Sequence, residues 1–247
     1  MIVIIGDTHI KNSEPHLYGL RKFFEWLIQN YKDANIISLG DLYDQSSPYN
    51  PIEAEFIGYM KQFKSFHILE GNHTISRRSG SGILHLQHHD SIFIYTDKIE
   101  IEIDGHKFLM LPWKYNAKET YESIEGNYDY ILTHVTPPQC AFGDEGIQLH
   151  LKGQYIHGHT HMQIDFIDAF KQNHKVIGIP VVTRNSENQE YRIFTIDSKL
   201  QEIKVPIFFE YQTLNYGEFP ENKNNILNIK CCPSYQSVCY RRWTKIQ

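Results

Sequence analysis

Histidines are concentrated in one short segment of the chain. The segment YIHGHTH, residues 155 to 161, holds three of the 14 histidines. In a strand, His157, His159 and His161 would share one face, because side chains alternate along a strand. A turn at Gly158 would instead re-aim the last two. Both a metal site and a polar strand end agree with this pattern, so the segment alone does not choose between them.

Four other segments place acids, amides or imidazoles where an apolar run ends. They read GDTH at 6–9, GDLYD at 40–44, GNHT at 71–74 and LTHV at 132–135. Carboxylate and imidazole ligands together suit manganese, iron or zinc, and a set of about seven such side chains is too large for one ion. Two ions that share a carboxylate would use the whole set. If the preceding runs are strands of one sheet, their ends meet at the same edge.

Apolar runs and helical patterns alternate over the first 70 residues. The runs at 2–5, 35–39 and 66–70 read as strands, and the segments at 17–31 and 51–63 read as helices. Helical spacing is clearest for Leu17, Leu20, Phe24 and Leu27. Such alternation predicts a parallel sheet with crossover helices, in which the carboxyl ends of the strands hold ligands.

From about residue 91 the pattern changes to short strands with turns such as Asp104-Gly105. We expect these strands to be antiparallel additions. The predicted fold class is therefore α/β, with two sheets packed face to face as a β-sandwich and helices outside. Residues 76–82, SRRSGSG, read as a flexible loop.

Composition limits the classes of function. The chain has 247 residues, a net charge of −5 and no apolar run near the roughly 20 residues of a membrane span. A protein that coats nucleic acid through a basic surface is disfavoured, whereas a nuclease with local positive charge is not. The first residues, MIVIIGDTHI, lack the basic start and long apolar core of a signal peptide. We expect a cytoplasmic protein with reduced cysteines.

Taken in order, the five polar segments resemble the calcineurin-like metallophosphoesterases, whose pattern is D-x-H, G-D, G-N-H, a lone histidine and G-H-x-H. The resemblance implies a sandwich of two sheets between helices and two divalent metal ions, manganese first among them. It also implies that the ions activate a water for attack on a phosphoester. By resemblance, the ligands of the first ion are Asp7, His9 and His161, those of the second are Asn72, His134 and His159, and Asp41 bridges the two.

Two further residues receive catalytic roles by the same resemblance. His73 matches the family histidine that protonates the leaving group or stabilises the transition state, and Asp44 is the natural partner to orient and charge it. Asp44 could instead be a turn acid before QSSP. His157 has no counterpart in the pattern and is expected to be a strand residue or a hydrogen-bond donor to a ligand. Thr74 stands where the family usually has an acid.

The segment GDLYDQSSPYNP narrows the comparison. It lacks the arginine with which phosphoprotein phosphatases of this superfamily bind a phosphate monoester, and it resembles the SbcD-type nucleases of DNA repair and recombination. FLMLPWKYN and KVIGIPVV resemble the phage branch of that group. This resemblance implies DNA as substrate. It also raises an SbcC-type ATPase subunit and a second copy of the chain as partners.

The resemblance covers residues 1–206, which we take as the nuclease domain. Residues 207–247 are expected to form a C-terminal extension, either a reduced cap or an edge hairpin. Arg77 and Arg78 follow a metal motif and are expected to reach a substrate phosphate. Two other functions stay open: a phosphodiesterase for small molecules such as cyclic nucleotides, and a metal-bound interaction protein without turnover.

Overall fold

The computed structural model describes residues 1–46, 50–76, 80–141, 146–181, 191–208, 210–215 and 225–230. Its helices are α1 (Glu14–Tyr31), α2 (Asn50–Met60), α3 (Ala117–Tyr121) and the 3-10 helices η1 (Leu84–His88) and η2 (Pro138–Cys140). The predicted helices at 17–31 and 51–63 correspond to α1 and α2. No helix in these ranges is long and apolar enough to cross a membrane.

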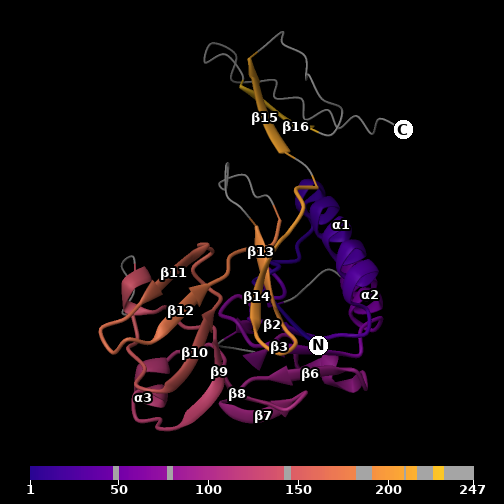
Figure 1. Ribbon diagram of the computed structural model, residues 1–247. Helices are drawn as coiled ribbons and strands as arrows, with labels where there is room; N and C mark the ends of the chain where they lie inside the picture. Colours follow the sequence, from indigo (N-terminus) through magenta and orange to yellow (C-terminus); the bar gives the residue numbers. More distant parts are fainter. Residues whose placement is uncertain are drawn as a thin grey trace.

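The first sheet contains the strands predicted near the N-terminus (Figure 1). Its order is β14 (Leu200–Lys204), β13 (Arg192–Ile196), β1 (Ile2–Ile5), β2 (Asn35–Ser38), β3 (Ser65–Leu69) and β6 (Ile92–Tyr95). Strands β1, β2, β3 and β6 are parallel, whereas β13 and β14 are antiparallel additions. The carboxyl ends of β1, β2 and β3 therefore lie at one edge.

The second sheet differs from the antiparallel arrangement expected after residue 91. Its order is β11 (Ile164–Ile167), β12 (Asn173–Val176), β10 (Lys152–His157), β9 (Asn127–Thr133), β8 (His106–Leu111) and β7 (Ile99–Ile103). Only the outer strands β7 and β11 are antiparallel to their neighbours, and the four central strands are parallel. The connections over 112–126 and 134–151 are long enough to cross over between parallel strands. The short apolar runs in the sequence did not reveal that these strands are parallel.

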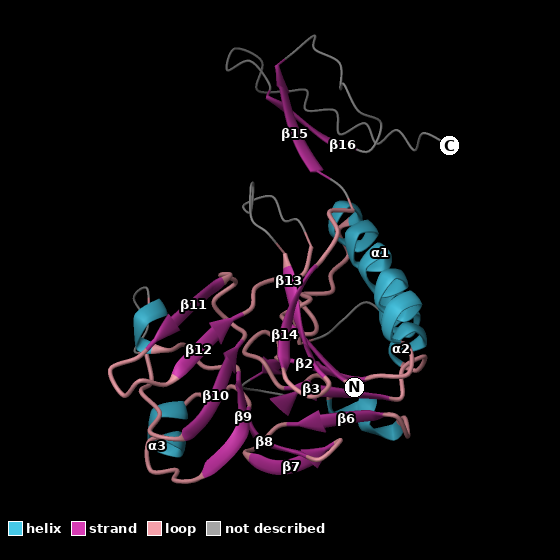
Figure 2. Cartoon of the chain, viewed as in Figure 1, coloured by secondary structure: helices cyan, strands magenta, loops and turns pink. Residues whose placement is uncertain are grey.

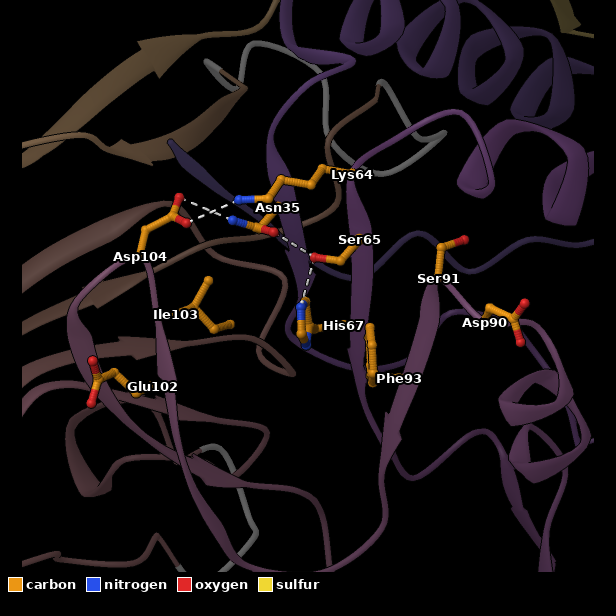
Figure 3. A pocket seen from close by; sticks show the side chains of 10 residues that line it. All are labelled: Asn35, Lys64, Ser65, His67, Asp90, Ser91, Phe93, Glu102, Ile103 and Asp104. Carbon is orange, nitrogen blue, oxygen red and sulfur yellow. Dashed lines mark hydrogen bonds and ion pairs between the residues drawn. The ribbon is translucent and has the colours of Figure 1, made fainter.

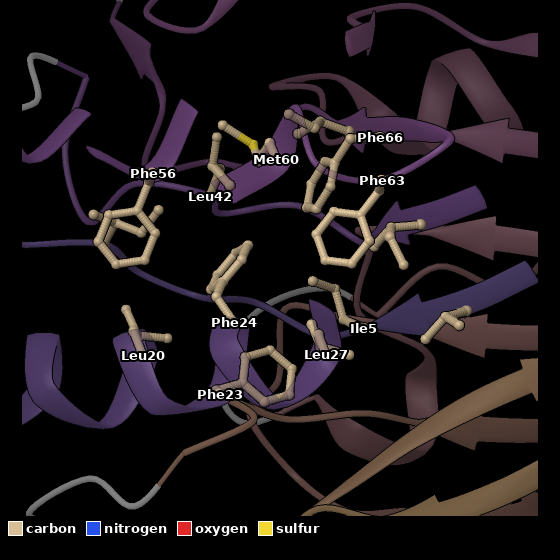
Figure 4. Close-up of a cluster of buried hydrophobic side chains, with 14 of the residues drawn as sticks. Ile5, Leu20, Phe23, Phe24, Leu27, Leu42, Phe56, Met60, Phe63 and Phe66 are labelled. Carbon is tan, nitrogen blue, oxygen red and sulfur yellow. The ribbon is translucent and has the colours of Figure 1, made fainter. Parts of the chain in front are cut away.

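Alternate side chains of β1 belong to two different hydrophobic cores. Ile2 and Ile4 face the second sheet, where they meet Phe108, Met110 and Leu132 in the core between the sheets. The remaining two side chains of β1 face α1 and α2, in the phenylalanine-rich core drawn in Figure 4. A strand that is apolar at every position is what burial on both faces requires.

A third core covers the outer face of the second sheet. It includes Leu109, Ile131 and Tyr155 from the sheet and Tyr121 from α3. The layers are therefore helices, sheet, sheet and α3, as Figure 2 shows. This is the α/β sandwich that the sequence predicted.

Two further pairs of strands lie outside the two large sheets. Strands β4 (Ile75–Ser76) and β5 (Gly80–Ser81) form a short antiparallel pair, and Arg77 and Arg78 between them lie outside the described residues. Strands β15 (Glu210–Asn215) and β16 (Asn225–Lys230) pair in parallel with each other, which differs from a hairpin. The remaining residues of the predicted C-terminal extension after Phe208 lie outside the description, and the domain boundary at 206 stays a prediction.

Candidate metal centre

Both sheets contribute to one polar site at the carboxyl ends of their parallel strands. From the first sheet, Asp7, Asp41 and Asn72 follow β1, β2 and β3. From the second, His134 and His159 follow β9 and β10. Parallel strands deliver their ends to a common edge, and face-to-face packing brings the two edges together. The expected ligands, which span residues 7 to 161, are therefore close in space.

One group of donors consists of Asp7, His9, Asp41 and His161. One ligand atom from each residue lies within 4.8 Å of all the others. Nε2 of His9 is 2.8 Å from Nε2 of His161 and 3.7 Å from Oδ2 of Asp41. Nε2 of His161 is 3.5 Å from Oδ2 of Asp7. These two carboxylates and two imidazoles form a donor set suited to a borderline divalent ion.

A second group consists of Asp41, His134 and His159, again with one ligand atom from each within 4.8 Å. Nε2 of His134 lies 3.2 Å from Oδ2 of Asp41 and 3.2 Å from Oδ1 of Asn72. Asp41 belongs to both groups, as a bridging carboxylate must. The division of the seven residues between two ions remains a prediction.

The backbone at this edge is strained. Four of the donor residues have positive φ angles although they are not glycine: His9 (45°), Asp41 (41°), His159 (71°) and His161 (54°). Such conformations cost about 1–3 kcal/mol each and persist where the surrounding structure fixes them. Their concentration here indicates that the placement of these side chains outweighs the conformational cost to the backbone.

Two buried carboxylate oxygens test whether metal ions fit. Among the described residues, Oδ1 of Asp7 and Oδ2 of Asp41 are buried and accept no well-aligned hydrogen bond. Uncompensated burial of a charged oxygen is costly. Imidazoles lie close to these atoms, and the Asn72 amide oxygen contacts one of those imidazoles, so divalent cations would satisfy both carboxylates and use the neighbouring donors. The residues present fit such ions.

Charge coupling within the site agrees with this test. Burial alone would lower the pKa of His134, but Asp7 and Asp41 outweigh burial and raise it to about 9. His159 lacks so strong a partner, and burial together with the charge of His134 lowers its pKa to about 4. The two carboxylates therefore attract one positive charge at neutral pH, and a divalent cation would supply it in place of the proton.

Comparison with known proteins identifies the family. The family model described as calcineurin-like phosphoesterase matches residues 1–163. The chain belongs to this family. The matched part of the phosphoesterase contains all seven expected ligands, and a phosphoesterase of this family uses divalent metal ions.

Two solved structures resemble this phosphoesterase at low sequence identity. An archaeal phosphodiesterase of 19% sequence identity covers 82% of this chain and 98% of its own, with a TM-score of 0.47. A hypothetical protein from Thermus thermophilus shares 11% identity, covers 83% of this chain and 99% of its own, and gives a TM-score of 0.42. No protein with a curated description matches in sequence. These likenesses indicate nothing about substrate.

Asp44 contacts His73 in a different way from the one expected. Its backbone carbonyl accepts a hydrogen bond from Nδ1 of His73 at 3.0 Å. Its carboxylate instead lies 3.2 Å from Nδ1 of His9 and 3.4 Å from Nζ of Lys11. The contact with His9 lowers the pKa of Asp44, with a smaller contribution from Lys11. The Asp44 carboxylate thus pairs with the His9 imidazole, while the Asp44 main-chain carbonyl holds the His73 ring, and ligand atoms of the three residues lie within 4.8 Å of one another.

Contacts on the far side of two rings, a hydrogen bond for His134 and a close carboxylate for His9, orient these rings toward the site. Nδ1 of His134 donates to the carbonyl of Leu39 at 2.8 Å, which leaves Nε2 for the centre. Nδ1 of His9 faces Asp44, which likewise leaves Nε2. Such outer partners fix tautomer and basicity in metal sites. Sequence analysis missed the Leu39 carbonyl, because a main-chain acceptor leaves no residue signature.

The side chain of His157 lies outside the site. It ends β10 and is buried, and its Nε2 lies 2.8 Å from Nδ1 of His174. The turn after it re-aims His159 and His161, so the three histidines do not share one strand face. A shallow pocket of about 460 Å³, drawn in Figure 3, is also separate. It lies at the opposite strand ends, beside Asn35 and Ser65.

Gly71 lets the GNH turn approach Asp41 closely. A Cβ there would collide with both Oδ1 and the backbone nitrogen of Asp41. We therefore expect Gly71→Ala to lower the free energy of unfolding by about 1–3 kcal/mol and to weaken metal binding. Urea unfolding and calorimetric titration with Mn²⁺ measure these effects. The control is Gly58→Ala in α2, where a Cβ meets nothing within 4 Å. Equal behaviour of the two variants would contradict the close approach.

Proposed function

We propose that this phosphoesterase is a two-metal phosphodiesterase that hydrolyses DNA, as SbcD-type nucleases do. The observation that carries the two-metal part is the sharing of Asp41 between two donor groups at one sheet edge. The resemblance of GDLYDQSSPYNP to SbcD-type nucleases supports DNA as the substrate. Manganese is the ion proposed by the resemblance, and mixed carboxylate and imidazole donors suit it as they suit iron and zinc.

The proposed ligands are Asp7, His9 and His161 for one ion, Asn72, His134 and His159 for the other, and Asp41 for both. When bound, two such ions activate a water and neutralise charge that develops on the phosphoryl oxygens. The protein fixes the donors beforehand. Asp41 illustrates this, because its Oδ1 accepts the backbone N–H of His73 at 2.9 Å while Oδ2 faces the imidazoles.

His73 is proposed to protonate the leaving oxygen. Its ring is exposed at the rim of the site and stands edge-on to His9, with ring centroids 4.7 Å apart. Because Nδ1 donates to the Asp44 carbonyl, Nε2 is the atom left to face a substrate. A protonated imidazole held in this way can give its Nε2 proton to a departing alkoxide.

The residues near the entrance agree with a diester better than with a monoester. A phosphate diester carries one negative charge and a free monoester carries about two, so a monoester site gains more from an additional cation. The phosphatases carry their arginine directly after an acid. In GDLYD the corresponding acid is Asp44, and no arginine follows it. Nζ of Lys11 instead pairs with Asp44. We further propose that Arg77 and Arg78 contact DNA phosphates. An SbcC-type ATPase and a second copy of the chain are the proposed partners.

The proposed function predicts manganese-dependent degradation of linear duplex DNA. The full chain is incubated with Mn²⁺ and, separately, with end-labelled duplex, single-stranded circles or cyclic dinucleotides. We expect cleavage of DNA, its complete loss in excess EDTA and its return when Mn²⁺ exceeds the chelator, because the protein's donors alone supply no nucleophile. Activity that survives excess EDTA would contradict the metal centre. Turnover of cyclic dinucleotides without DNA cleavage would replace DNA by a small-molecule substrate.

A further inference from the structure

His174 is a buried histidine outside the metal centre with no role in the proposed reaction. It lies in β12 between β10 and β11 and is 4% exposed. Buried polar rings are costly unless their hydrogen bonds are satisfied.

Aromatic rings cover both faces of the His174 imidazole. Phe166 of β11 stacks at a centroid distance of 4.6 Å and an interplanar angle of 10°. Tyr155 of β10 stacks at 4.4 Å and 12°. The three residues are paired across adjacent strands, so the sheet itself aligns the rings. His174 is thereby confined to one plane.

The two nitrogens of His174 lie near two buried partners. Nδ1 is hydrogen-bonded to Nε2 of His157 at 2.8 Å, whereas Nε2 lies 3.4 Å from Oδ2 of Asp168 without a well-aligned hydrogen bond. Asp168 is itself held, because its Oδ1 accepts the backbone N–H groups of Phe170 and Gln172. The result is a chain of close contacts from the β11–β12 turn through β12 to the last residue of β10.

This chain ends where the strained ligand segment begins. Residues 158–163 connect β10 to β11 and carry His159 and His161, both with positive φ. His157 immediately precedes the segment and pairs with His174. Phe166 lies just after the start of β11 and stacks on the same ring. One imidazole therefore contacts the strands at both ends of the segment.

We propose that His174 is a positioning residue for the metal centre, which with His157 and Asp168 holds the ends of segment 158–163 so that His159 and His161 keep their strained conformations. The inference rests on the proposed metal ligands. Strain of this kind persists only where neighbouring structure imposes it, and a fixed end on each side supplies that restraint. Because the segment contributes one ligand to each proposed ion, loosening it weakens both sites.

The test compares calorimetric Mn²⁺ titrations of the full chain and of the double variant His157→Phe and His174→Phe. Phenylalanine keeps the stacked rings and removes the in-plane hydrogen bond from both partners, which limits the loss of stability. We expect the dissociation constants of both ions to rise about 10–100-fold, the usual cost of losing partners behind metal ligands. Thermal unfolding in EDTA establishes that each protein is folded at the titration temperature.

His67→Phe is the matched control. His67 is also a buried histidine, stacked on Phe93 at 4.8 Å and hydrogen-bonded to Ser65, but it lines the separate pocket beside Asn35 and Ser65 (Figure 3). It should leave Mn²⁺ affinity unchanged. A merely structural role for His174 would lower the unfolding temperature in EDTA and leave the dissociation constants at their original values.

Asp168→Asn is a milder variant that tests the same inference if the double variant does not fold. Asp168→Asn keeps an oxygen for the two backbone amides but turns an amide nitrogen toward Gln148 and His174, both of which face Oδ2 in the native chain. It should weaken Mn²⁺ binding in the same direction by a smaller factor. Unchanged affinity in a folded variant would overturn the inference. Failure of the unaltered chain to bind Mn²⁺ would overturn the proposed function, and the inference with it.

Discussion

Asp41→Asn should remove both metal ions and abolish cleavage, the largest effect expected of any single substitution. Among the described residues, Asp41 alone belongs to both of the proposed ligand groups. Burial alone would raise its pKa, but His134 and His9 lower it instead, so the carboxylate is ionised and available to cations. Asparagine keeps an oxygen for the His73 amide and removes only the charge. Losing partners of ligands already costs about 10–100-fold in affinity, so losing this ligand should cost more than about 100-fold.

Asp7→Asn provides the comparison, because Asp7 belongs to one group only. Metal analysis after dialysis in limiting Mn²⁺ should find about one ion per chain in the Asp7 variant and almost none in the Asp41 variant. Calorimetry gives the corresponding affinities, and duplex cleavage gives the activity. If both variants retained one ion, Asp41 would not be the shared ligand and the bridging assignment would be wrong.

His73→Ser should keep both ions and lose cleavage by about 10²–10⁴-fold, the usual contribution of a general acid. His73 is exposed, and its Nδ1 is engaged by a main-chain carbonyl, so its removal takes no proposed ligand away. The loss should be smaller for bis-p-nitrophenyl phosphate, because p-nitrophenolate departs without a proton whereas the alkoxide of DNA needs one. Cleavage rates for the two substrates and the metal content of the variant measure these effects.

Asp44→Asn separates orientation of a ligand from help to the leaving group. Asparagine keeps the backbone carbonyl that holds His73 but changes the group that faces His9. We therefore expect weaker binding of one ion, with equal losses for DNA and for the nitrophenyl diester.

Two outcomes for the His73 variant would contradict the acid role. An empty second metal site, or equal losses of activity on DNA and on the nitrophenyl diester, would make His73 a ligand or a positioning residue.

The sequence by itself determined the elements of the first half of the chain and the identity of the polar edge. IVII at 2–5 is apolar at every position because both faces of β1 are buried, and α1 places Leu17, Leu20, Phe24 and Leu27 on one buried face. These are local signals, since hydrophobic periodicity follows directly from strand and helix geometry. The glycines that directly precede the polar groups after β1, β2 and β3 marked the strand ends in the same way.

Only the tertiary structure decided how the later strands pair and which groups support the ligands. Short strands look alike whether their neighbours are parallel or antiparallel, because pairing depends on where the connections lead. The carboxylate of Asp44 pairs with His9 and its main-chain carbonyl accepts from His73, an arrangement set by side-chain direction at a turn. His174 lies 13 positions after His161 in the sequence and in no motif. Its contacts with both ends of the ligand segment exist because β10, β12 and β11 lie side by side in the folded sheet.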